Sequence, residues 1–455
     1  MIRILTLSLL LAAPALAAPG DADDAKAMLK AGIGFATVKG RGQVPAYADW
    51  LKSRLVAGGF APGDIVITPA GETARLHLVW KGSGKRPPLA LAGHMDVVEA
   101  NPRDWTRDPF TAVEEGGFVF GRGASDNKFD TTMIAATLIA LKRQGFKPGR
   151  DIHFFLSGDE ETSGATAAAQ AAEAKAAGVE LLLNGDSGGG LVDDAGKPLF
   201  YSLSGAEKSY ADYALTVTDP GGHSSRPTGS NAIAILAAAT AKVAAYQFPA
   251  EISDITRASL RDAGTKTGGA LGAAMLAFVA NPKDTAAIAT LRASPDTVGQ
   301  IGTTCVPTMV SGGHAENALP QKAVLNVNCR IWPGVGLETV RGDLERVVAD
   351  PRVKVALAND DFHSAPPSPL RPDVVAAVTK AVATARPGVV PVPGMDAGAS
   401  DSLFYRAAGI PSYGVSGLMM RGEDVLIHGL NERVPVAAIA PALVHWRVLI
   451  TEMAK

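Results

Sequence analysis

Histidine and acidic residues repeatedly follow short apolar runs in this chain. His94 and Asp96 come after PLALAG, the pair Glu160–Glu161 comes after IHFFLSGD, and Asp186 comes after LLLNG. In open α/β sheets, functional side chains gather at the carboxyl ends of the strands. We therefore expect five separate segments to bring their polar residues to one rim of a sheet. The complete set is His94, Asp96, Asp126, Glu160, Glu161, Asp186 and His428.

These residue types point to metal-dependent hydrolysis. Zinc binds His nitrogen and carboxylate oxygen, and a catalytic zinc keeps one position for water. Two His with three carboxylates suit two metals that share one carboxylate, and such a pair can polarise a hydroxide and stabilise an oxyanion. Of the adjacent Glu160 and Glu161, one can ligate while the other takes the proton of the attacking water. Asp96 is placed to accept the second ring N–H of His94.

Two kinds of pattern predict the elements that position this set. Apolar runs at 76–80, 88–92, 151–157 and 180–184 show little alternation, which is typical of strands buried in a mainly parallel sheet. Helical patterns lie at 22–60, 131–144 and 165–177. Strands alternating with helices indicate an α/β layered domain.

The pattern changes near residue 206. Residues 210–218 alternate as a half-exposed antiparallel strand does, 303–311 and 323–332 suggest a hairpin, and helices are expected at 230–246, within 250–298, and at 337–348. The segment 370–455 returns to helix, strand (411–415) and helix. We predict an α/β catalytic domain (19–206 and 363–455), with a mainly parallel sheet, interrupted by an inserted α+β domain (207–362).

The first residues predict export. Arg3 precedes an apolar run, and Ala15-Leu16-Ala17 fits a small-x-small cleavage site, so residues 1–18 are interpreted as a signal peptide. We expect a periplasmic or secreted protein that has no membrane contact after cleavage. With 43 basic against 45 acidic residues, the charge balance gives no support for a nucleic-acid partner.

The two cysteines leave two alternatives open. Cys305 and Cys329 lie in the two strand-like runs of the expected hairpin, so they either form a disulfide or remain two buried free thiols. A cysteine-ligated metal is disfavoured because no CxxC spacing occurs. A serine hydrolase is disfavoured because no GxSxG elbow occurs.

Eight sequence blocks carry a resemblance to a known family. The chain resembles the dizinc aminoacylase/carboxypeptidase family of metallopeptidases, which includes glutamate carboxypeptidase-like enzymes, over about residues 26–450. The blocks occur in the family's order: GHMDVV, DWTRDPF, GRGASDNK, SGDEE, NGDSGG, PGGHSSRP, GGHAENALP and HGLNERV. The resemblance implies a zinc-exopeptidase catalytic domain with an inserted lid or dimerisation domain.

The resemblance also implies a role for each candidate residue. Asp126 would bridge two Zn²⁺ ions, for which cobalt or manganese would be substitutes. Glu160 would be the general base and Asp96 would orient a His ligand. The remaining ligands would be His94 and Asp186 on one metal, and Glu161 and His428 on the other.

Further residues match positions of the lid and of the substrate loop. His223 matches a lid histidine that, in dimeric relatives, reaches the active site of the partner subunit, which implies a homodimer through the lid. Asn317 and Arg330 match residues that contact substrate, and an Arg is a suitable anchor for a carboxylate. Gly394 resembles the substrate loop more loosely.

The expected function is cleavage of an amide bond in short peptides, as a carboxypeptidase or dipeptidase. The alternatives are an N-acyl amino acid amidohydrolase (aminoacylase) and a catalytically silent binding protein, which would be signalled by loss of Glu160 or of a ligand. Two departures from the family pattern stand out. Asn127-Lys128-Phe129 replaces the common Met-Lys-Gly, and the segment 250–298 lengthens the lid.

Overall fold

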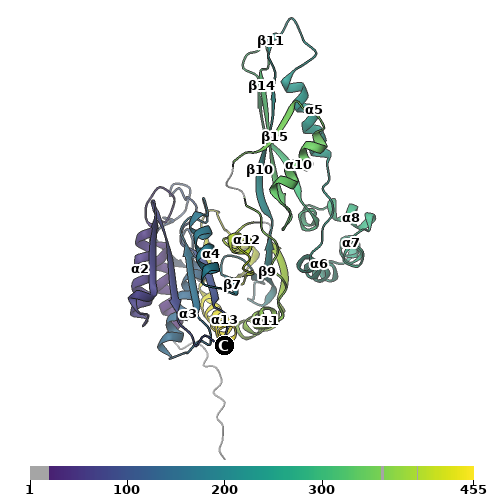
Figure 1. The fold of residues 1–455 in the computed structure, drawn as a ribbon. Coiled ribbons are helices and arrows are strands. Elements are labelled where there is room, and N and C mark those ends of the chain that lie inside the picture. The colour runs from purple at the N-terminus through teal and green to yellow at the C-terminus, as the bar shows by residue number, and fades with distance from the viewer. Residues whose placement is uncertain (1–19, 360–362, 397) are drawn as a thin grey trace, which may run out of the picture.

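The computed structural model describes residues 20–359, 363–396 and 398–455. The predicted signal peptide, residues 1–18, lies outside the described residues. The first and last parts of the chain, purple and yellow in Figure 1, form one body, and the middle part extends away from it as an elongated lid. Strands β9 and β10 run consecutively from the body into the lid (Figure 1).

The body is built on a ten-stranded mixed sheet. Its central strands β6, β3, β7 and β17 are parallel to one another. In sheet order the strands are β1 (Ile65–Ala70), β2 (Thr73–Trp80), β6 (Ile152–Ser157), β3 (Leu89–His94), β7 (Leu181–Asn184), β17 (Ser412–Gly414), β9 (Pro198–Glu207), β8 (Gly189–Val192) and β18 (Met419–Met420), with β16 (Val392–Asp396) paired to β9.

Helices cover both faces of this sheet. Leu89, Leu91 and Phe154 face the larger apolar core with one set of helices, whereas Ala90 and Phe155 face a smaller core with the other set. The larger core includes α1 (Asp21–Ile33), α2 (Val44–Ala57), α3 (Lys128–Arg143), α11 (Pro372–Ala385) and α13 (Ile439–Met453), and the smaller one includes α4 (Ala165–Ala176) and α12 (Ser402–Ala407). The predicted α/β class with a mainly parallel central sheet is confirmed. The prediction holds because strands with continuous apolar runs need helices to cover both faces of their sheet.

Strand β2 differs from its prediction in detail. It pairs antiparallel with β1 and β6, and its burial alternates from residue to residue, whereas the sequence suggested little alternation. The partly exposed positions carry Arg75 and His77, whose side chains lie beside Glu173 of α4. Long polar side chains near a sheet edge can cover apolar surface while their polar ends stay in water.

The lid contains a four-stranded antiparallel sheet with helices on one face. Its strands are β12 (Thr304–Gly312), β14 (Lys322–Ile331), β10 (Ser209–Thr218) and β15 (Val353–Leu357), in that order. The alternating residues of β10 and β14 pack onto α5 (Ala232–Ala245) and α10 (Leu337–Val348). The tip of the lid carries the short strands β11 (Gly222–His223) and β13 (Ala318–Leu319) (Figure 1). The predicted antiparallel strand, hairpin and two helices are confirmed.

The hairpin decides between the two cysteine alternatives. Cys305 of β12 lies directly opposite Cys329 of β14, and the two form a disulfide.

The segment 250–298 is helical, as expected in part. It forms α6 (Asp254–Thr267), α7 (Gly269–Ala280), α8 (Thr285–Arg292) and α9 (Pro295–Val298). These helices have their own apolar core, and Ile255 of α6 packs against Trp332 of the lid and Met395 of the body. The insertion therefore contacts the junction between lid and body.

A small sheet and one long apolar helix complete the body. The sheet consists of β4 (Val113–Glu115), β5 (Phe118–Phe120) and β19 (Arg433–Pro435). Within the described residues, the stretch Val436–Met453 is long and apolar enough to cross a membrane by length and composition alone, although no membrane contact was expected after the signal peptide. It is 61% buried inside the fold, and its residues Trp446 and Leu449 are part of the main core.

Two domain boundaries were predicted, at 206 and at 362. The first, at 206, lies within β9, one residue before its end, and the second, at 362, lies outside the described residues.

Candidate metal centre

Three neighbouring strands deliver most of the candidate ligands. His94 is the last residue of β3, Glu160 and Glu161 lie in the turn after β6, and Asp186 follows β7. Because β6, β3 and β7 are adjacent and parallel, their carboxyl ends meet at one rim. Asp126 reaches this rim from the loop before α3, and His428 from the loop before β19.

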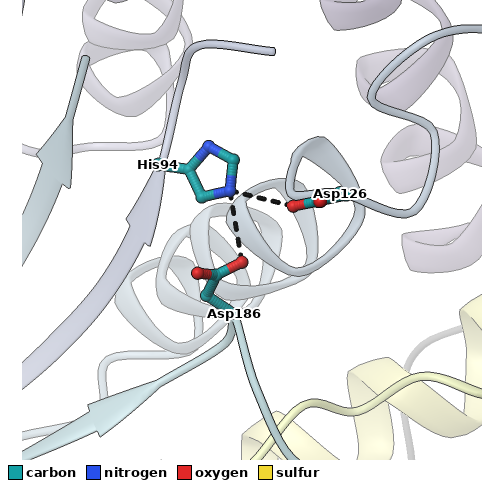
Figure 2. A group of neighbouring side chains, drawn as sticks. All are labelled: His94, Asp126 and Asp186. Atoms are coloured by element: carbon teal, nitrogen blue, oxygen red, sulfur yellow. Dashed lines mark hydrogen bonds and ion pairs between the residues drawn. The ribbon is translucent and has the colours of Figure 1, made fainter. Parts of the chain in front are cut away.

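His94 lies between two carboxylates. Its Nε2 is 2.9 Å from Oδ1 of Asp126 and 3.2 Å from Oδ1 of Asp186, as Figure 2 shows. Its Nδ1 is 3.0 Å from the carbonyl oxygen of Asp96. Because that carbonyl can only accept a hydrogen bond, Nδ1 donates to it, which leaves Nε2 as the ring nitrogen that faces the two carboxylates and could bind a metal.

Asp126 joins this group to a second one. While its Oδ1 faces His94, its Oδ2 lies 3.1 Å from Nε2 of His428, and the same His428 nitrogen lies 3.1 Å from Oε1 of Glu161. Two sets of potential ligand atoms, each within 4.8 Å of one another, therefore share one carboxylate: His94, Asp126 and Asp186, and Asp126, Glu161 and His428. The structure thus brings the five predicted ligands together, and a third set within the same distance, His94, Glu160 and Glu161, includes the predicted base.

Asp96 holds the turn that carries the two glutamates. Its carboxylate oxygens accept hydrogen bonds from the backbone N–H groups of Glu160 and Glu161, at 3.1 and 3.0 Å. The same carboxylate lies 3.5 Å from Nδ1 of His94, farther than the carbonyl of the same residue. Asp96 thus orients the His94 ring mainly through its backbone and orients the glutamate pair through its side chain.

The electrostatics of the centre favour added positive charge. Burial raises the pKa of Asp186 to about 7, and burial followed by the charge of Asp186 raises the pKa of Glu160 well above its usual range. Burial opposes the charged form of His94, yet Asp186 and Asp126 outweigh it and hold that pKa high. The hydrogen bond with Asp126 raises the pKa of His428 to about 9. A divalent cation would displace these protons and relieve the repulsion among the carboxylates.

A buried ion pair that the sequence analysis missed ties two of these loops together. The carboxylate of Glu432 accepts hydrogen bonds from the backbone N–H groups of Gly123, Ser125 and Asp126, at 2.8–3.0 Å. Arg122 donates to Glu432 at 2.7 Å and also to the carbonyl oxygen of His428 at 3.2 Å. Arg122 belongs to the motif GRGASD and Glu432 to the motif HGLNE, but their spacing in the sequence did not indicate that these two residues would pair.

Arg330 lies at the lid side of the centre. A cleft of about 940 Å³ is lined by the cluster carboxylates, by His428, and by Arg330 and Tyr210 of the lid. The Arg330 guanidinium lies 4.8 Å from the centre of the Tyr210 ring. This placement is compatible with the expected substrate contact.

The other lid candidates lie elsewhere in the single chain. His223 belongs to β11 at the lid tip (Figure 1), and the carbonyl oxygen of Asn317 accepts a hydrogen bond from Ser224 beside it. Neither residue lines the cleft. Gly394 lies in β16 against β9, where an added Cβ would meet Oγ of Ser202 at 2.4 Å, and it does not line the cleft.

The departure at Asn127 has a packing explanation. Its side chain donates to the carbonyl oxygen of Gly185 at 3.2 Å and lies so close to Gly93 that an added Cβ there would meet it at 2.7 Å. The neighbouring Lys128 is buried and donates to the carbonyl oxygens of Gly32 and Phe35. Both residues fasten the loop of Asp126 to adjoining segments.

An α/β body with this His and carboxylate cluster at the rim of its sheet defines a hydrolase of the metallopeptidase class. Residues 90–452 match the model of peptidase family M20/M25/M40, and the chain belongs to this family. The resemblance stated from the eight sequence blocks is thereby confirmed.

Two curated relatives illustrate the range of activities in the family. The chain is 30% identical over 399 residues to an N-fatty-acyl-amino acid synthase/hydrolase of Danio rerio, covering 85% of this chain and 76% of that protein. It is 27% identical over 372 residues to a probable carboxypeptidase S-like protein of Dictyostelium discoideum, covering 78% of this chain and 70% of that protein.

Solved structures of low sequence identity share the fold. An M20 family metallo-carboxypeptidase from Sulfolobus solfataricus matches with a TM-score of 0.72 at 16% identity, over 94% of this chain and 99% of that one. A dinuclear metal-binding M20 peptidase of Bacillus subtilis matches with a TM-score of 0.60 at 14% identity, over 96% of this chain and 100% of that one.

Proposed function

We propose that the protein is a two-zinc hydrolase that cleaves the amide bond between an acyl group and an amino acid with a free carboxylate. The observation that carries the proposal is the shared carboxylate of Asp126, one oxygen of which faces His94 and the other His428. In the proposed arrangement Asp126, His94 and Asp186 hold one metal, and Asp126, Glu161 and His428 the other. Zinc held by these residues would lower the pKa of the attacking water and polarise the substrate carbonyl.

The protein side chains would do the remaining work. Glu160 lines the cleft beside the cluster and has no assigned ligand role, so it would take the proton of the attacking water and pass it to the leaving amine. Arg330, on the opposite lid side, would hold the substrate carboxylate. Short peptides satisfy this description, which makes carboxypeptidase or dipeptidase activity the first candidate.

N-acyl amino acid hydrolysis is the second candidate. An N-acyl amino acid has the same free carboxylate and the same kind of amide bond as a short peptide. The two substrates differ only in the group on the acyl side of the bond. The relative from Danio rerio, named for N-fatty-acyl-amino acids, favours it.

We expect Glu160→Gln to retain metal but to lose turnover by roughly 10²–10⁴-fold, the usual contribution of a general acid–base group. The measurement combines metal analysis with a panel of dipeptides and N-acetyl amino acids. Chelation should abolish the activity of the wild type, and added zinc should restore it. Normal turnover by the Gln variant would contradict the base role.

A homodimer formed through the lid is also proposed. Strand β12 is the edge of the lid sheet, and its Met309 and Val310 are each 72% exposed beside the half-exposed Ile233 of α5. An exposed apolar strand edge is a surface that another chain can cover. A second copy would be the source of His223 and Asn317, which lie away from the cleft of their own chain.

Export is proposed on the signal-like first residues. The disulfide between Cys305 and Cys329 is compatible with an oxidising compartment such as the periplasm or the exterior. N-terminal sequencing of the protein recovered from the native host tests cleavage after residue 17 or 18.

A further inference from the structure

An apolar surface begins a few residues beyond the metal centre. Strand β8 starts three residues after Asp186, and its Leu191 lies directly opposite Phe200 of β9 and Met420 of β18. Residues opposite one another on paired strands project from the same face of a sheet. These three side chains therefore form one apolar row, and all of them line the cleft that contains the cluster, although Met420 is a buried side chain at 4% exposure.

A second apolar wall arises from the loop that carries His428. Val425 and Ile427 precede this residue and line the same cleft, at 44% and 50% exposure. Leu191 is 37% exposed. Exposed apolar side chains thus adjoin the cluster on the sides of both Asp186 and His428. Contiguous apolar surface that stays open to water beside convergent polar groups is typical of a ligand site.

The charges of the cleft restrict what this surface can bind. Among its described lining residues, the carboxylates are the four of the cluster and Asp130. The oxygens of Asp130 already accept hydrogen bonds from Ser416, the backbone N–H of Gly417 and the ring N–H of Trp446. A free ammonium group placed between the apolar walls would lose its water without gaining an anionic partner. An uncharged alkyl chain would bind favourably there, because its burial removes apolar surface from water.

We infer that these two walls form an apolar trough, lined by Leu191, Phe200, Met420, Val425 and Ile427, which binds an alkyl chain on the acyl side of the scissile amide. The inference rests on the proposed amide hydrolysis and narrows its substrate to N-acyl amino acids with medium or long alkyl chains. The amino acid carboxylate lies toward Arg330, and the alkyl chain runs over the row on β8, β9 and β18.

The first test is a chain-length series with the metal-loaded wild type. Acetyl-, butyryl-, octanoyl- and dodecanoyl-alanine are compared by kcat/KM, together with alanyl-alanine. Burial of each methylene is worth about 0.8 kcal/mol, so kcat/KM should rise roughly threefold to fourfold per methylene until the trough is full. A flat series overturns the inference.

The second test removes the trough without touching the cluster. The double variant L191S/V425S should keep the rate of the wild type on the acetyl substrate and lose the rise with chain length. L199S is the matched control, because Leu199 neighbours Phe200 on β9, is 55% exposed and does not line the cleft. The control should keep the full rise. The inference is overturned if the double variant keeps its metal content and Tm and its kcat/KM still rises with chain length as steeply as that of the wild type.

The outcomes separate this inference from the proposed function. Turnover of alanyl-alanine or acetyl-alanine with no dependence on chain length overturns the trough and leaves amide hydrolysis standing. Absence of turnover on every substrate, at full metal content, overturns both.

Discussion

At the scale of the residue, Arg330 brings a positive charge to the cleft. The other acidic and basic residues that line this cleft, within the described chain, are carboxylates and His428. If it anchors the substrate carboxylate, Arg330→Ala removes a charged hydrogen bond worth about 1.5–3 kcal/mol. We expect KM to rise roughly tenfold to a hundredfold for substrates with a free carboxylate and to change little for their amidated forms. Steady-state kinetics on such matched pairs checks this. Lys322→Ala, at the opposite end of β14, is the control. An equal rise for both forms would remove the anchor.

At the scale of the element, the pair Arg122–Glu432 fastens the loop of Asp126 to the loop of His428. Glu432→Gln preserves shape but replaces one accepting oxygen by an N–H₂ group among hydrogen-bond donors, and it leaves the buried Arg122 without an anionic partner. Removal of one member of a buried pair costs about 3–5 kcal/mol. Loss of such supporting contacts typically lowers metal affinity 10–100-fold. We expect weaker zinc binding by titration calorimetry and a lower Tm, both unchanged in Glu423→Gln, whose side chain is exposed. Wild-type zinc affinity in Glu432→Gln would show that the pair does not position the ligands.

At the scale of the whole molecule, the proposed dimer predicts complementation between two inactive variants. Glu160→Ala lacks the base, and His223→Ala lacks the residue that its partner would receive. In a mixed dimer, one of the two sites combines an intact Glu160 with the intact His223 of the other chain. Refolding or co-expressing the two variants together should therefore restore part of the wild-type activity, up to roughly a quarter for random pairing of chains that exchange freely. Mixtures as inactive as their components would refute the shared site.

The meeting of the candidate metal ligands at one rim could be predicted because their positions depend on local chain geometry. His94, Glu161 and Asp186 each follow a buried apolar strand, and parallel neighbouring strands end at the same rim. The type of each side chain then determines which ions it can bind. The same local logic predicted the alternating strands of the lid and its helix at 337–348, which the structure places at Leu337–Val348.

Contacts between segments far apart in the chain were decided only by the tertiary structure. The register of β8 against β9 and β18 aligns Leu191, Phe200 and Met420 into one row, although Leu191 and Met420 lie far apart in the chain. Packing of two distant loops joins Arg122 to Glu432, and the antiparallel register of the hairpin pairs Cys305 with Cys329. Sequence periodicity reports which face of an element is buried, whereas the neighbour on that face depends on how the whole chain packs.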